Sequence, residues 1–270
     1  MLAKLLKYDF KAMFKIFLPL WGVLLVVSGI NRLFTGAGLN AEEGLGLVNS
    51  LMVLLYVLLI MAVMVVTTVI IIARFYQGLL KDEGYLMFTI PVKPWQLVAS
   101  KLISAVVISV LSVLVAFISV LIIASYQGFF YDLTQVWEVL GTMTPNANGL
   151  AILSVVSVFV GLICAVSQVY ASMALGHLAG SHRVGFAVLA FIVLSVIWST
   201  VGSVIGMFGY PDVTTSLTTV TTQSDAVQVM TVFSDVMGTA LIWGLVLDVV
   251  RCVVHLIITN YILSRRLNLE

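Results

Sequence analysis

Six long apolar runs restrict this chain of 270 residues more than any other feature. A helix that crosses a membrane needs about 20 mostly apolar residues. The segments that meet this requirement are 16–34, 47–73, 102–126, 150–179, 184–208 and 237–263. Only 9% of the residues are charged, whereas soluble domains carry about 25% and need them to cover their surface. The sequence therefore predicts an all-α integral membrane protein with six transmembrane helices in a single domain over 1–270.

The basic residues between these runs indicate an orientation, because Lys and Arg accumulate in cytoplasmic connections. One side of the predicted membrane receives eleven of them: Lys4, Lys7, Lys11, Lys15, Arg74, Lys81, Lys93, Lys101, Arg183, Arg265 and Arg266. The other side receives only Arg32. We therefore expect both termini to lie in the cytoplasm. The net charge of +1 excludes a generally basic nucleic-acid binder.

The first fifteen residues combine two faces at helical spacing. The apolar face consists of Leu2, Leu5, Leu6, Phe10, Met13 and Phe14, and Phe17 continues it. Lysines occupy the other face. This pattern predicts an amphipathic helix over 1–15 that lies in the cytoplasmic interface, with Pro19 near the turn into the first span. The alternative is that these residues are simply the cytoplasmic end of the first span.

Two connections lie on the opposite side of the predicted membrane. Residues 126–149 are rich in aromatic residues, which favour the headgroup level. Residues 209–236 are rich in Thr and Ser and contain no basic residue. We expect these outer connections to form a partly embedded, polar-lined layer.

Three ionisable residues interrupt the sixth apolar run: Asp248, Arg251 and His255. Ionisable groups in a membrane are costly and often functional. Asp248 and Arg251 are three residues apart, so they are neighbours on one helix face and can neutralise each other. We interpret the group first as a structural ion pair, and the alternatives are the lining of a substrate pathway and a proton relay.

Small residues recur at a spacing of four in two of the apolar runs. Ser172, Gly176 and Gly180 share a face of the fourth run, and Gly202 and Gly206 share a face of the fifth. Small residues allow helices in membranes to approach closely. We interpret both sets as helix-packing positions within one subunit.

The segment 74–101, RFYQGLLKDEGYLMFTIPVKPWQLVASK, concentrates charged and aromatic residues between two apolar runs. Asp82 can cap a short helix over 82–88, and Pro91 pushes the residue before it out of helical geometry. Pro94 suits the first turn of the next helix. The pattern predicts a short cytoplasmic helix that is acidic at its start and aromatic along its length. It either packs on its own bundle or docks a cytoplasmic partner.

The same segment and the ending NYILSRRLNLE resemble the permease subunits of bacterial ATP-binding-cassette transporters of the type-two class. The likeness is greatest for the compact six-span permeases of Gram-positive bacteria, among multidrug, lantibiotic and polysaccharide exporters. In that family the short cytoplasmic helix couples the permease to a separate ATPase. By position, the resemblance implies a coupling segment made of Asp82, Glu83, Gly84, Tyr85, Leu86, Phe88 and Pro91.

The resemblance further implies two permease copies, or one copy with a related permease, and two cytoplasmic ATPase subunits at the bacterial cell membrane. ATP and Mg²⁺ would bind to the ATPases, because this chain has no G-x-x-x-x-G-K-[ST] motif. We therefore expect a transport subunit that is not itself an enzyme. The alternatives are an ion-coupled transporter using Asp248 and His255, and a membrane scaffold or immunity protein that does not transport.

Overall fold

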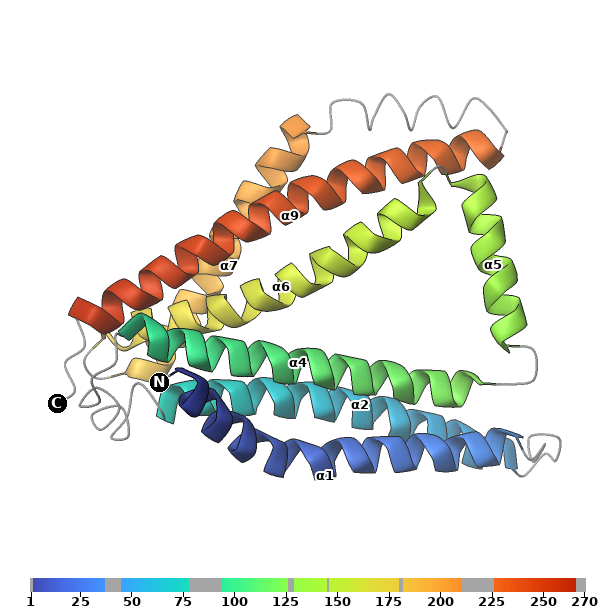
Figure 1. Cartoon of the computed structure of the whole chain (residues 1–270), viewed down its shortest axis with the longest axis horizontal. Coiled ribbons are helices and arrows are strands. Elements are labelled where there is room, and N and C mark those ends of the chain that lie inside the picture. The colour runs from blue at the N-terminus through green and yellow to red at the C-terminus, as the bar shows by residue number, and fades with distance from the viewer. Residues whose placement is uncertain are drawn as a thin grey trace. The chain divides into compact units, whose positions relative to one another are not determined.

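The structure, a computed structural model, describes residues 2–36, 45–77, 94–125, 129–144, 146–179, 182–209 and 226–265. Within these ranges the chain forms seven α-helices and no strand (Figure 1). The helices are α1 (Leu2–Gly36), α2 (Leu45–Phe75), α4 (Pro94–Ala124), α5 (Phe129–Met143), α6 (Ala147–Gly176), α7 (Arg183–Gly209) and α9 (Ala226–Arg265). All except α5 are long and apolar enough to cross a membrane. The predicted all-α fold with six candidate spans is confirmed.

The chain divides into two compact units, residues 1–131 and 132–270. The first contains α1, α2 and α4, and the second contains most of α5 together with α6, α7 and α9. Each unit is therefore built around three candidate spans.

In the first unit, α1 packs on α4 and α2, and α2 packs on α4. The apolar core comprises Met13, Phe17, Trp21, Leu24, Tyr56, Val63, Ile108 and Ala116. Side-chain hydrogen bonds join every pair of helices. Trp21 Nε1 donates to Ser112 Oγ at 3.1 Å, Tyr56 and Ser119 share a bond of 2.8 Å, and Asn31 donates to the Met52 carbonyl at 3.3 Å.

The first helix differs from the expected division into an interfacial helix over 1–15 and a span over 16–34. α1 is one continuous helix with Pro19 inside it. Figure 1 shows that its first turns run at an angle to the rest, as expected where proline removes a backbone hydrogen bond. The apolar face of these turns is used for protein packing, because Met13 and Phe17 are buried in the core.

In the second unit, α6 packs on both α9 and α7, and α7 also contacts α9. The approach of α6 to α7 is very close at the end of α6. A Cβ atom added to Gly176 would lie 2.5 Å from the backbone nitrogen of Ala187. Only glycine fits there without a shift of one helix.

Two of the outer connections are more helical than expected. Residues 129–143 of the connection 126–149 form α5, and residues 226–236 of the connection 209–236 form the first turns of α9. The coupling segment from Asp82 to Pro91 and the position of Gly180 lie outside the described residues.

Candidate functional site

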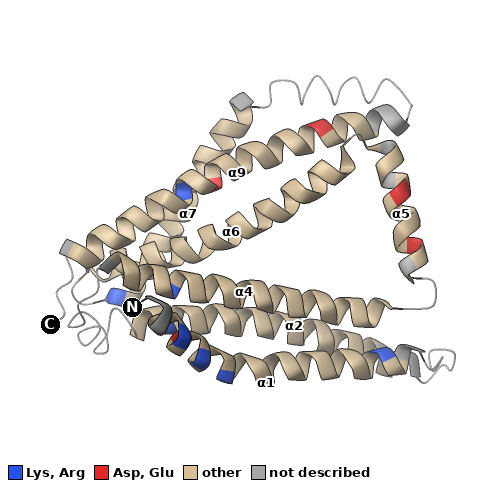
Figure 2. Ribbon diagram, viewed as in Figure 1, with Lys and Arg blue, Asp and Glu red and all other residues tan. Residues whose placement is uncertain are grey.

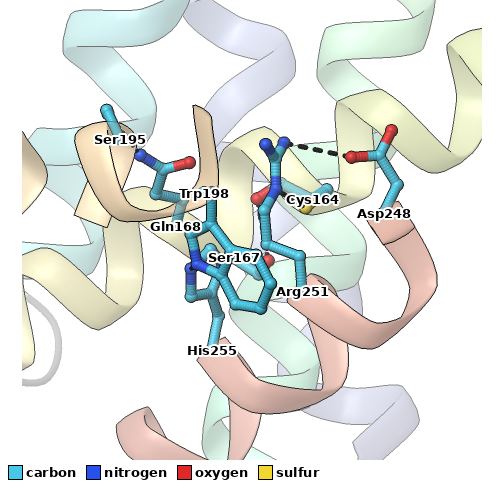
Figure 3. Close-up of polar contacts among 8 residues, drawn as sticks. All are labelled: Cys164, Ser167, Gln168, Ser195, Trp198, Asp248, Arg251 and His255. Carbon is cyan, nitrogen blue, oxygen red and sulfur yellow. Dashed lines mark hydrogen bonds and ion pairs between the residues drawn. The ribbon is translucent and has the colours of Figure 1, made fainter. Parts of the chain in front are cut away.

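The second unit contains a cluster of polar side chains between three apolar helices (Figure 3). Asp248, Arg251 and His255 come from α9, near the middle of its candidate span Met230–Ser264. Their spacing of three and four residues places them along one face of the helix. Cys164, Ser167 and Gln168 from α6 and Ser195 and Trp198 from α7 complete the cluster.

Arg251 is the centre of the charged part of this cluster. Its Nη2 atom lies 3.3 Å from Asp248 Oδ1, and about a quarter of each side chain is exposed within the chain (24% and 26%). Its Nε donates to the sulfur of Cys164, which is fully buried on α6. The positive charge is therefore neutralised within α9 and also joined to α6.

His255 is fully buried and contacts Trp198 on α7. Trp198 Nε1 donates to His255 Nε2 at 3.0 Å, and the two rings meet edge to face at 89°. A nitrogen that accepts this bond carries no proton, so the imidazole is neutral and its proton is on Nδ1. That Nδ1 atom is buried and has no hydrogen-bond partner among the described residues.

The amide side chain of Gln168 joins α6 to α7. Gln168 Nε2 on α6 donates to Ser195 Oγ on α7 at 2.7 Å, and Ser195 in turn donates to the carbonyl of Phe191. Together with the Arg251–Cys164 and Trp198–His255 bonds, this contact closes a triangle. Among the described residues, each of the three helix pairs in the unit is held by at least one polar side-chain contact.

The arrangement restricts the chemistry that this cluster can perform. Among the residues that the structure describes, no group of three His, Cys, Asp or Glu side chains is placed to hold a metal ion. The acid is paired with an arginine and the imidazole accepts from an indole. The geometry therefore fits a structural role, in which polar contacts hold the three helices together. The Asp248 and Arg251 side chains are the partly exposed side of this cluster.

The other residues singled out from the sequence fall in different places. Ser172 is buried, and its hydroxyl donates to the Val169 carbonyl at 2.7 Å. Gly202 faces Leu247 on α9, where an added Cβ would lie 3.5 Å away in ordinary contact. Gly206 is half-buried near the end of α7.

Sequence reasoning missed the partners of the α9 group. Nothing about the position of Cys164 in the sequence indicates a bond to an arginine 87 residues later in the chain. Gln168 carried a usable signal, because it is the only amide side chain between residues 149 and 176. A lone amide inside an apolar helix usually needs a partner on a neighbouring helix.

Comparisons with protein-family models, with curated proteins and with solved structures found no match to this chain.

Proposed function

We propose that the chain is the membrane-spanning subunit of an ATP-driven exporter of the ATP-binding-cassette type. It would work with two separate ATPase subunits in a bacterial cell membrane, with both termini in the cytoplasm. The observation that carries the proposal is the charged and aromatic segment over 74–101, which resembles the coupling segment of type-two permeases.

The fold offers a route by which force on this segment would move the protein. The segment connects the end of α2 to the start of α4, and both helices belong to the first unit. Phe75 at the end of α2 and Leu97 near the start of α4 are buried. A partner that pushes on residues 82–88 would therefore move packed helices rather than a free loop.

The second unit supports a rigid-body role. Its three helices are joined pairwise by polar contacts, and alternating access needs parts that move without deforming. No residue of the α7 candidate span is fully buried within the chain (0%), so much of its surface is left for lipid or a second permease copy. We infer a dimer with a substrate pathway between the two copies.

The distribution of charge supports the proposed orientation. Lys7, Lys11 and Lys15 are exposed along one side of the first turns of α1, and Figure 2 shows this basic stripe. Anionic headgroups of the cytoplasmic leaflet attract such residues at about 1 kcal/mol each.

The test is a co-expression experiment with the Walker-motif ATPase that we expect in a neighbouring reading frame. The double variant Glu83→Arg with Tyr85→Ala should abolish copurification of the ATPase and the stimulation of its ATP hydrolysis. The matched control is Asp132→Arg with Tyr131→Ala, which makes the same changes on α5 and should leave both unchanged. If the double variant at 83 and 85 binds and stimulates like the unmodified chain, the proposal is wrong.

A second candidate, ion-coupled transport, is favoured by one observation in the α9 group. His255 Nδ1 holds a buried proton without a partner, one turn from Arg251. This candidate predicts proton uptake into proteoliposomes that contain the chain alone, followed with an enclosed pH-sensitive dye under an imposed potential. Asp248→Asn should abolish that uptake. If proteoliposomes with the unmodified chain alone take up no more protons than empty vesicles, ion coupling is excluded.

A further inference from the structure

The helix α5 has two chemically different faces. Leu133, Val136 and Trp137 recur at helical spacing on one side, and Phe129 precedes them at the same spacing. Thr134, Glu138 and Thr142 share the opposite side. A helix with this division needs an apolar surface to cover one face.

No other part of the described chain supplies that surface. Every residue from 131 to 139 is exposed, and Leu133, Val136 and Trp137 are at least half exposed (53%, 56% and 50%). All of the extensive helix–helix contacts in the described ranges join other helices.

The connections of α5 fix where it must lie. Four residues separate it from Ala124 at the end of α4, and three separate it from Ala147 at the start of α6. An extended chain covers at most about 3.6 Å per residue, so both ends of α5 stay close to the ends of candidate spans. At about 1.5 Å per residue, α5 is roughly 22 Å long and too short to cross a hydrocarbon core of about 30 Å.

The turn between α5 and α6 changes the direction of the chain. Asn146 adopts a left-handed conformation with φ 62°, which asparagine tolerates better than most residues. Its carbonyl accepts from the Leu150 nitrogen at 3.0 Å and thereby begins α6. In Figure 1, α5 runs across the end of α6 rather than along it.

We propose that α5 is an interfacial helix whose Leu133, Val136 and Trp137 are inserted in lipid at the membrane surface where α4 ends and α6 begins. Indole and phenol rings favour that level of the bilayer. This inference does not depend on the exporter proposal.

The charge of α5 indicates which lipid headgroups the helix prefers. Interfacial helices commonly carry Lys and Arg that attract anionic headgroups. Here Asp132 and Glu138 are acidic, and no Lys or Arg occurs between residues 102 and 182 (Figure 2). Insertion of α5 therefore depends on apolar area alone, and electrically neutral zwitterionic headgroups suit it better than anionic ones.

Site-directed spin labelling of the full chain in phosphatidylcholine vesicles tests this proposal. Cys164 and Cys252 are first replaced by Ser, which keeps an acceptor for Arg251. Single labels then follow from Leu133→Cys and Val136→Cys on the apolar face, with Glu138→Cys and Thr142→Cys as matched controls on the polar face. Oxygen should accelerate the spin relaxation of the labels at 133 and 136 strongly, and a water-soluble nickel chelate should affect them little. At the control positions 138 and 142, the nickel chelate should have the larger effect.

Three results would overturn the proposal. Equal access of the nickel chelate to all four labels would place α5 in water. Protection of positions 133 and 136 from both reagents would show that protein covers the face, and dipolar broadening would identify that protein as a second copy. Deeper insertion on addition of phosphatidylglycerol would contradict the preference for neutral headgroups, whereas unchanged or shallower insertion supports it.

Discussion

Asp9 on α1 and Lys101 on α4 form an ion pair of 2.5 Å, with side chains only 12% and 8% exposed. The contact joins the first turns of the chain to α4, and Lys101 is the last residue of the segment 74–101. From the sequence, Lys101 is one of the basic residues that set the orientation, and the structure shows that a carboxylate also neutralises it.

Removal of one partner of this pair should destabilise the first unit strongly. Lys101→Met leaves the Asp9 carboxylate buried without its cation, and loss of one partner of a buried pair costs about 3–5 kcal/mol. The double variant Asp9→Leu with Lys101→Met should recover most of that loss, because both charges are gone. Thermal unfolding in detergent measures the effect, and Lys11→Met, at an exposed position of α1, should change the melting temperature little.

Ser112 accepts a hydrogen bond from Trp21 Nε1 at 3.1 Å in the same unit, and its Oγ also lies 3.3 Å from Thr67 Oγ1. Ser112→Ala leaves the buried indole N–H without an acceptor, at a cost of about 1–3 kcal/mol. Ser125→Ala is a suitable control, since its hydroxyl bonds only to the Ile122 carbonyl, three residues earlier in the chain, among the contacts observed. Equal melting temperatures for both variants would show that the bond to Ser112 does not stabilise the unit.

Trp198→Phe should keep the ring against His255 and remove only the N–H donor. Side-chain hydrogen bonds between membrane helices are worth about 0.6 kcal/mol on average and up to about 1.7 kcal/mol. We expect a loss near the upper value, because His255 is fully buried and its Nε2 loses its donor. Unfolding by titration with denaturing detergent reports the loss. Trp243→Phe, at an exposed position of α9, should have no comparable effect.

Two glycines of α6 should respond differently to the same change. The Cβ of Gly176→Ala would lie 2.5 Å from the backbone of Ala187, so α6 and α7 must separate. Overpacking of this kind costs about 1–3 kcal/mol. The Cβ of Gly161→Ala meets only Asp248 Oδ2 at 3.9 Å, and alanine favours the helix. A melting temperature that falls for Gly161→Ala as much as for Gly176→Ala would contradict the close approach at Gly176.

The six candidate spans were predictable because each combines length with near-continuous apolar composition. Pro94 also marked the start of α4, since its missing N–H and fixed φ suit a first helical position. Pro19 was expected near the turn into the first span, and in the structure it lies inside one continuous, bent helix. One absent hydrogen bond bends a helix without ending it when apolar neighbours such as Phe17 and Trp21 continue the packing.

The candidate site was harder to predict than the spans. Asp248, Arg251 and His255 stood out because charge is rare in this chain, and the local Asp248–Arg251 pair follows from helix periodicity alone. Their partners on α6 and α7 depend on how three uniformly apolar helices rotate about their axes. Such helices carry almost no amphipathic signal, so the contacts of Cys164 and Trp198 could not be predicted from the sequence and are seen only in the structure. The helix α5 was missed because it was interpreted as part of a connection, being too short to resemble a span.

Each unit contains its own set of side-chain bonds between helices, and this has a consequence for synthesis of the chain. Every helix pair among α1, α2 and α4 has its own side-chain bond, and so has every pair among α6, α7 and α9. A ribosome that has just released residue 131 into the membrane has already supplied both partners of each of these bonds in the first unit. The first unit can then assemble before the rest is translated, and each unit made from a separate message should still reach its own internal packing.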